Sequence, residues 1–326
     1  PRGLADWRSL LAHDPELVAA PIESLPLHHD FDDFGLYTAR SGWDTDAAFV
    51  GLRCGPASAE SATARLGFDF GESHLLPNQG DFSFFLWGKF ILPGCEYPKL
   101  KLTSNHNVIV FEGRDTQAGR LVGQLGEGGP WFNAAGPTDP DRDYASRAST
   151  PRVLHREHTA RYHHHLCELG GLYRLRDERA PDGVVFTEYT RSLVFLPDSA
   201  VAVVDRVRTP HPRTAHFRLL TALDRLTPDE HGFAFDLWGV PGRINDYSPV
   251  AFARTAAVEH LSAATNADQR VATLRAENVT EAVFAVVIGV GAGTRYRIVT
   301  DARGYDLLDG DGDNATALRV NWPATH

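Results

Sequence analysis

The sequence has no methionine and three cysteines among its 326 residues. The cysteines Cys54, Cys95 and Cys167 are far apart and form no CxxC or CxxH pair, so the sequence indicates neither a disulfide framework nor a zinc finger. The chain begins with Pro1, so we do not treat it as a bare translation product. The lack of a signal peptide therefore says nothing about secretion.

Basic residues are also in deficit, with 32 Lys and Arg against 42 Asp and Glu and a net charge of -10. This balance argues against a nucleic-acid partner, because binding to a polyphosphate requires a surplus of cationic side chains. A site for an acidic sugar would have to be locally basic. The chain as a whole therefore repels polyanions.

Long apolar runs and internal repeats are missing as well. The longest uncharged apolar stretch, 282–293, is shorter than the ~20 residues of a membrane-spanning helix, so no membrane partner is predicted. No motif recurs at a fixed period, which disfavours propellers and β-helices.

What the sequence does contain is a long series of short alternating apolar runs bounded by Gly, Pro or Asp. Residues 4–20 place Leu4, Trp7, Leu10 and Leu11 at helical spacing, and about a dozen strand-like runs follow. We therefore predict a mostly β protein: a large antiparallel β-sandwich with a short N-terminal helical segment. The predicted boundaries are a helical leader at 1–30 and a sandwich at 31–326, with a subdivision near 225–240 left open.

Five motifs occur in order along the first part of the chain. They are "LPLHHDFDDFGLYTARSGWD" at 25–44, "HLLPNQGDFSFFLWGKFIL" at 74–92, "EYPK" at 96–99, "SNHNVIVFEGRDTQ" at 104–117 and "GEGGPWF" at 126–132. Together they resemble the C-terminal β-sandwich half of the heparinase II/III-like polysaccharide lyases. A weaker likeness, "YTRSLVFLPDSAVAVVDRV", extends to about residue 207.

The resemblance implies a two-part architecture, in which an α/α toroid precedes the sandwich and the substrate cleft lies between them. The helical leader would be the tail of that toroid, and the rest would come from a parent chain or another subunit. The implied reaction is β-elimination on a uronic-acid polysaccharide: a base removes the C5 proton, donors stabilise the resulting charge, and an acid protonates the leaving oxygen. The implied location is secreted or periplasmic.

The resemblance also implies which residues form the site. His74 matches the first histidine of the family motif and, with Tyr97, is the predicted catalytic pair. The predicted substrate-binding residues are Asn78, Arg40, His106, Asn107 and Trp131. For each a structural role stays open: a core aromatic for Tyr97, backbone hydrogen bonds for His106 and Asn107, loop packing for Trp131, and an ion pair with Asp30, Asp32 or Asp33 for Arg40.

The zinc site that the resemblance implies is degenerate in this sequence. Leu76 stands at its second histidine, and Gly94, Cys95 and Glu96 stand where an aspartate is expected. Leucine cannot bind a metal, so no cofactor and no metal ligand are predicted. A rebuilt site that uses Cys95 or Glu96 with His106 is the alternative.

A second group of histidines lies in "RVLHREHTARYHHHLCELGG" at 152–171, which holds His155, His158 and three consecutive histidines at 163–165. Neighbours on a strand point to opposite faces, so they cannot all converge on one ion. We interpret the tract as a polar or cleft-lining strand rather than a metal site.

Three functions remain open from the sequence. The first is a polysaccharide lyase, represented here mainly by its β-sandwich. The second is a non-catalytic carbohydrate-binding or scaffold β-sandwich, and the third is a uronate epimerase-like protein, since epimerisation begins with the same C5 proton abstraction.

Overall fold

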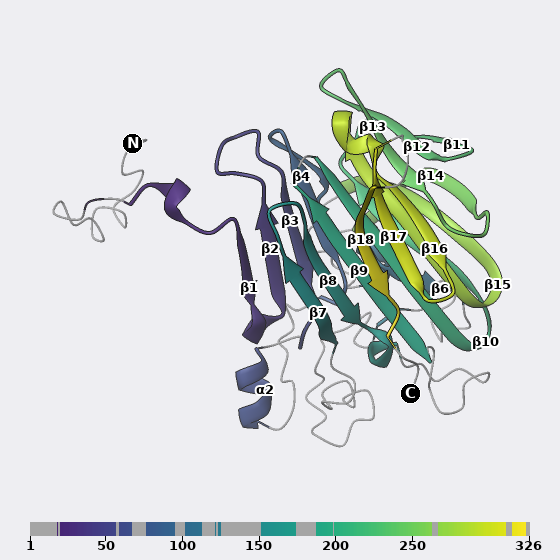
Figure 1. The fold of residues 1–326 in the computed structure, drawn as a ribbon. Coiled ribbons are helices and arrows are strands. Elements are labelled where there is room, and N and C mark those ends of the chain that lie inside the picture. Colours follow the sequence, from purple (N-terminus) through teal and green to yellow (C-terminus); the bar gives the residue numbers. More distant parts are fainter. Residues whose placement is uncertain are drawn as a thin grey trace.

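The computed structural model describes residues 18, 20–56, 59–66, 76–94, 102–112, 121, 123–124, 151–173, 187–197, 199–262, 267–310 and 315–323. These residues form three antiparallel sheets that lie against one another (Figure 1). The predicted mostly-β sandwich is confirmed. Helical structure in the described part comprises α2 (Glu60–Leu66) and the short 3-10 turns Ile22–Ser24, Asp32–Phe34, Thr103–Asn105, Gly170–Leu172 and Gly291–Arg295.

The first sheet has five strands in sequence order, joined as a meander. They are β1 (His28–Phe31), β2 (Leu36–Arg40), β3 (Phe49–Arg53), β4 (Phe82–Leu86) and β5 (Lys89–Leu92). Strand β4 reads "FSFFL", and its residues alternate between buried and half-buried, as expected when one face of a sheet packs on a core.

The second sheet has ten strands and is the centre of the molecule. Its main path runs β11-β12-β13-β15-β10-β9-β8-β7, while β14 pairs with β15 and β6 pairs with β10. The strands are β6 (Ile109–Phe111), β7 (Arg152–His158), β8 (His163–Glu168), β9 (Glu188–Leu196), β10 (Ala200–Thr221), β11 (Thr227–Asp229), β12 (Gly232–Leu237), β13 (Val240–Asp246), β14 (Ala253–Ser262) and β15 (Ala267–Val290).

The third sheet, with β16 (Arg297–Asp301), β17 (Gly304–Asp309) and β18 (Ala315–Asn321), covers part of the other face of the ten-stranded sheet (Figure 1). Strand β10 shows why three layers form. Val201 and Val203 belong to the core shared with the five-stranded sheet, whereas Ala202 and Val204 belong to the core shared with the third sheet. The run "AVAVV" is apolar throughout because both of its faces are buried.

Two predicted boundaries can be compared with these sheets. Residues 28–30, which were assigned to the helical leader, belong to strand β1, while residues 1–17 lie outside the described residues. Residues 227–237 form β11 and β12, which continue the ten-stranded sheet without a break. Within the described part of the chain, no helix has the length and apolarity that crossing a membrane requires.

Candidate functional site

The described residues bring four histidines and one aspartate together between two sheets. We call this group, His28, Asp30, His158, His163 and His165, the histidine cluster. His28 and Asp30 come from edge strand β1, where they alternate with the exposed His29 and Phe31. The others come from the β7–β8 hairpin, in which His158 is the direct partner of His163.

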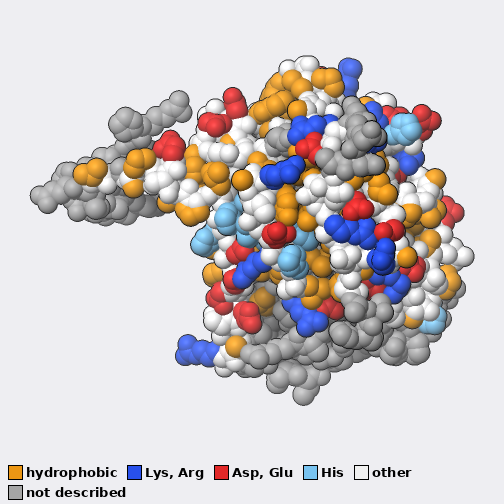
Figure 2. Space-filling model, in the orientation of Figure 1, with side chains coloured by type: hydrophobic (Ala, Val, Ile, Leu, Met, Phe, Trp, Pro, Cys, Tyr) orange, Lys and Arg blue, Asp and Glu red, His pale blue; other side chains and the backbone are white. Residues whose placement is uncertain are grey.

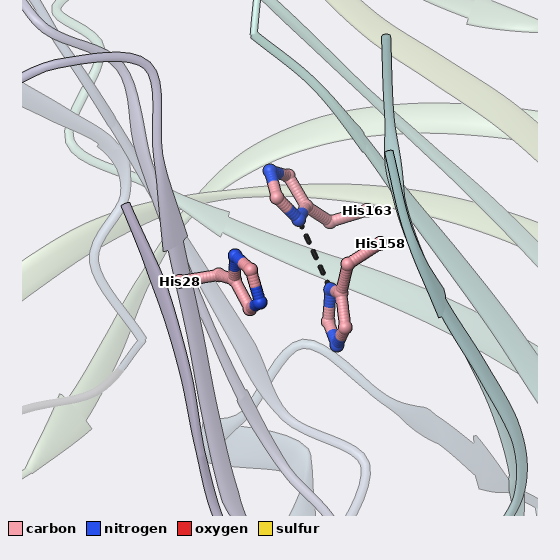
Figure 3. Close-up of side chains that lie close together, drawn as sticks. All are labelled: His28, His158 and His163. Atoms are coloured by element: carbon pink, nitrogen blue, oxygen red, sulfur yellow. Dashed lines mark hydrogen bonds between the residues drawn. The ribbon is translucent and has the colours of Figure 1, made fainter. Parts of the chain in front are cut away.

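The side chains of the histidine cluster are in close contact, and Figure 3 shows three of them, His28, His158 and His163. His158 Nδ1 lies 3.0 Å from His163 Nδ1. His158 Nε2 lies 3.1 Å from Asp30 Oδ2. His165 Nε2 lies 3.4 Å from Asp30 Oδ1. The His28 ring stacks on the His158 ring, with centroids 4.2 Å apart and planes 17° apart.

Burial and these contacts determine the charge of the histidine cluster. Burial opposes ionisation of Asp30, but hydrogen bonds from His165 and His158 outweigh it and hold the pKa of this carboxyl well below its usual range. Burial, followed by the neighbouring His158 and His28, lowers the pKa of His163 to about 4. Burial and His158 also lower the pKa of His28. At neutral pH, His28 and His163 therefore carry free nitrogen lone pairs beside an ionised carboxylate.

A pocket of about 350 Å³ lies beside the histidine cluster. Its wall includes His28, His158 and His163, together with Arg40 and Ser41. Figure 2 shows histidine side chains with charged side chains close by on this face of the molecule. The pocket can therefore admit a small polar or anionic ligand next to the imidazoles.

Arg40, one of the predicted substrate-binding residues, lies in this pocket with its guanidinium 3.9 Å from the centre of the Trp43 ring. The alternative of an ion pair between Arg40 and the aspartates of 30–33 is not what the described contacts show. Arg156 takes that position instead, 3.2 Å from Asp30 and in contact with Asp32. The planar guanidinium of Arg40 stays available for a carboxylate.

The other predicted residues do not join the histidine cluster in the described structure. His74, Tyr97 and Trp131 lie outside the described residues, as do Cys95 and Glu96 of the alternative zinc site. Asn78 is half-buried in the turn before β4, where its backbone bonds to Leu76 and Asp81.

His106 and Asn107 lie just before β6, and both are fully buried. His106 Nδ1 lies 3.0 Å from Asp81 Oδ2, and the Asn107 backbone N–H donates to the other carboxylate oxygen at 2.9 Å. The Asn107 side chain donates to the Phe82 carbonyl at 2.7 Å and accepts from the Leu220 N–H at 2.6 Å. The open alternative, in which the side chain satisfies backbone groups, describes the contacts of Asn107. The His106 ring instead contacts the Asp81 carboxylate through Nδ1, and its Nε2 is buried without a partner in the described structure.

The interpretation of the 152–171 tract is supported in one respect. His164 points to the face opposite His163 and His165, where its Nε2 lies 2.8 Å from Ser192 Oγ, which contacts the Tyr305 hydroxyl at 2.6 Å. Alternation therefore removes His164 from the histidine cluster but leaves its two neighbours on one face.

Sequence reasoning did not identify His28 and Asp30 as site residues. The signal was present as a two-residue spacing in "HHD", which matches the spacing of His163 and His165. Such a spacing places both side chains on one face of a strand. It could not show that β1 would lie beside the β7–β8 hairpin, about 130 positions away in the chain.

Comparisons with known proteins identify solved structures with a similar fold but no sequence family. No family model matches the chain, and no curated protein matches it. Among solved structures, a mutant of heparan sulfate lyase HepC from Pedobacter heparinus matches 94% of this chain with a TM-score of 0.61 and 13% identity. HepC itself matches 92% with a TM-score of 0.59 and 13% identity, and heparinase III, the BT4657 gene product, matches 89% with a TM-score of 0.58 and 12% identity.

The chain spans less than half of these solved structures, namely 44%, 43% and 41% of their lengths. Similarity at 12–13% identity shows the fold alone. The structural neighbours of this chain are thus heparinase III and heparan sulfate lyase chains, and it shares a β-sandwich fold with part of them.

Proposed function

We propose that this chain is the β-sandwich portion of a polysaccharide lyase-like protein that acts by β-elimination on a uronic-acid-containing polysaccharide. The observation that carries the proposal is the fold match to heparinase III and heparan sulfate lyase chains over about nine tenths of this chain. The ordered motifs between residues 25 and 132 support it independently. Because the chain spans under half of those neighbours, a toroid from a parent chain or another subunit completes the cleft in this proposal.

The proposed chemistry needs a base near the sugar C5 and donors near the uronate carboxylate. We assign the proton transfers of the sandwich to His74 and Tyr97, and sugar contacts to Asn78 and Trp131. The guanidinium of Arg40, open to a pocket, matches a carboxylate with two hydrogen bonds.

His106 and Asn107 have a different part in this proposal. Both are buried and bonded to the turn at Asp81 and Phe82, which follows Asn78. They hold that turn in place and so position Asn78 rather than contacting the sugar. An acidic polysaccharide is the proposed partner, and a secreted or periplasmic location suits such a polymer.

A second candidate is a non-catalytic carbohydrate-binding or scaffold β-sandwich. The observation that favours it is that both His106 and Asn107 are buried and the Asn107 amide is bonded within the protein, while Leu76 replaces a histidine of the motif. Uronate epimerisation stays the third alternative, because it shares the first proton abstraction.

The test compares this chain alone with the chain extended by its upstream region. Each is mixed with alginate, heparin, chondroitin or hyaluronan, and the ultraviolet absorbance of unsaturated uronate is followed. We expect a signal from the extended chain on one of these polymers, and its loss in His74→Ala but not in the exposed control His211→Ala. Sugar binding without any absorbance change would favour the binding module, and full turnover by His74→Ala would remove His74 from the site.

A further inference from the structure

The histidine cluster offers nitrogen atoms in the arrangement that a divalent transition-metal ion requires. One nitrogen from each of His28, His158 and His163 can be chosen so that all three lie within 4.8 Å of one another. Nitrogen ligands about 2.0–2.1 Å from a tetrahedral zinc ion lie about 3.3 Å from each other. The 3.0 Å between His158 Nδ1 and His163 Nδ1 is already close to that separation.

Asp30 determines which nitrogen of His158 is free. Its carboxylate can only accept, so at 3.1 Å it receives the Nε2–H of the neutral His158 ring. The lone pair of His158 is then on Nδ1, the atom that faces His163 (Figure 3). In metal sites, a carboxylate commonly accepts the other ring N–H of a metal-binding histidine and so fixes the orientation of its imidazole.

We propose that His28, His158 and His163 bind one zinc-class divalent ion, with Asp30 as the positioning residue behind His158. The pocket that these three histidines share with Arg40 and Ser41 has room for water or an anion as a further ligand. Binding requires the half-buried His28 ring to turn out of its 4.2 Å stack on His158, because a metal ion lies in the plane of each imidazole that it binds. His28 lies on edge strand β1, and its ring is only half-buried.

This site is separate from the position at which the family resemblance would place zinc. It uses strands β1, β7 and β8, whereas Leu76 and Gly94 flank β4 and β5. It also does not depend on the proposed lyase function, because three neutral imidazoles can bind an ion without any sugar.

A competing arrangement shares His158. Asp30, His158 and His165 also offer ligand atoms within 4.8 Å of one another. In that set Asp30 is already occupied by two imidazoles and by Arg156 at 3.2 Å, and the guanidinium charge disfavours a cation there. We therefore assign the ion to the three histidines.

The test is a titration of the chelator-treated 326-residue chain with Zn²⁺ by calorimetry, and with Co²⁺ by visible absorption. We expect one ion per chain, and intense Co²⁺ bands in the visible as for low-coordinate nitrogen sites. His158→Ala and His163→Ala should each abolish stoichiometric binding, whereas Asp30→Asn should weaken it about 10–100-fold. The matched control His155→Ala, an exposed histidine on the same strand β7, should bind as the parent does.

His165→Ala separates the two arrangements. We expect it to retain one ion per chain; loss of the ion in this variant with retention in His163→Ala would overturn the assignment. Failure of the parent chain to bind Zn²⁺ or Co²⁺ stoichiometrically would overturn the proposal itself. Circular dichroism of each variant shows that loss of the ion is not loss of the fold, and none of these readouts uses a polysaccharide.

Discussion

Arg191 on β9 and Asp205 on β10 are direct cross-strand partners and form a two-point ion pair that is inaccessible to solvent. Arg191 Nε donates to Asp205 Oδ1 at 2.8 Å and Nη2 donates to Oδ2 at 2.5 Å. The remaining Nη1 donates at 2.5 Å to the carbonyls of both Gly80 and Asn107. The buried Arg191 guanidinium thus joins the ten-stranded sheet to the motifs at 74–92 and 104–117, which supply residues of the proposed sugar site.

Replacing Arg191 by Met should therefore destabilise the chain strongly. The change leaves the Asp205 carboxyl buried with only the Tyr189 hydroxyl, 3.2 Å away, as a partner in the described structure. Removal of one member of a buried pair costs about 3–5 kcal/mol. Denaturant unfolding followed by fluorescence measures this loss.

Two further variants control that measurement. Arg191→Met combined with Asp205→Leu should recover part of the loss, because no charge is then left unpaired. Arg152→Met breaks an exposed pair with Glu168 and should cost at most about 1 kcal/mol. Equal effects of Arg191→Met and Arg152→Met would contradict the role of the buried pair.

Asn107→Ala should reduce the stability of the fold, because the Asn107 side chain is bonded within the protein. Its amide makes two buried hydrogen bonds, with the Phe82 carbonyl and the Leu220 N–H, and each group left unsatisfied costs about 1–3 kcal/mol. Asn78→Ala is the matched control, because the described contacts of Asn78 are made by its backbone. Thermal unfolding should separate the two variants, and an unchanged melting temperature in Asn107→Ala would contradict the structural role.

Gly35→Ala should disturb the turn that follows β1. Gly35 has a φ of +57°, and an added Cβ would lie 2.4 Å from the Cys54 carbonyl oxygen. The left-handed backbone costs about 1–2 kcal/mol for a residue with a Cβ, and the collision with backbone adds about 1–3 kcal/mol.

Gly88→Ala isolates the first of these two costs. Gly88 has a φ of +77° in the β4–β5 turn, and nothing lies within 4 Å of its added Cβ. We expect the free energy of unfolding to fall more in Gly35→Ala than in Gly88→Ala. A larger loss in Gly88→Ala would show that the collision at Cys54 is relieved at little cost.

Asp301 should titrate at an unusually low pH. Hydrogen bonds from Arg319, and then from the backbone N–H of Arg303, lower the pKa of this carboxyl to about 2. Because the pKa is depressed on folding, the stabilisation is fully present above the unfolded pKa of about 3.9 and is lost as the pH falls through about 2.

Nuclear magnetic resonance of the Asp301 carboxyl carbon measures this midpoint directly. Arg319→Ala should raise the midpoint toward about 3.9. Arg303→Ala keeps the backbone N–H that bonds to Asp301, so its midpoint should stay near that of the parent. A midpoint that Arg319→Ala leaves unchanged would contradict the assigned cause.

The sandwich could be predicted because strand signals are local. In β4, "FSFFL" alternates with a period of two, and in β10 "AVAVV" is apolar on both faces, so each segment shows its burial without knowledge of its partners. Alternation likewise predicted that His164 would face away from His163 and His165, which the structure confirms.

The surroundings of the predicted site residues His106 and Asn107 could not be predicted from the sequence in the same way. The buried state of His106 and Asn107, and the guanidinium of Arg191 that bonds to the Asn107 carbonyl, depend on residues 84 positions apart in the chain. No periodic pattern predicts a contact over such a separation, because the hydrogen-bond partners of a buried polar group depend on how the whole chain packs.

The sequence by itself thus determined the strands, their faces and the likeness to a lyase sandwich. Only the tertiary structure placed β1 beside the β7–β8 hairpin, and with it Asp30 beside His158 and His165. The physical reason is that side-chain alternation is a property of each strand, whereas the meeting of two strands from different sheets follows from how the whole chain buries its apolar faces.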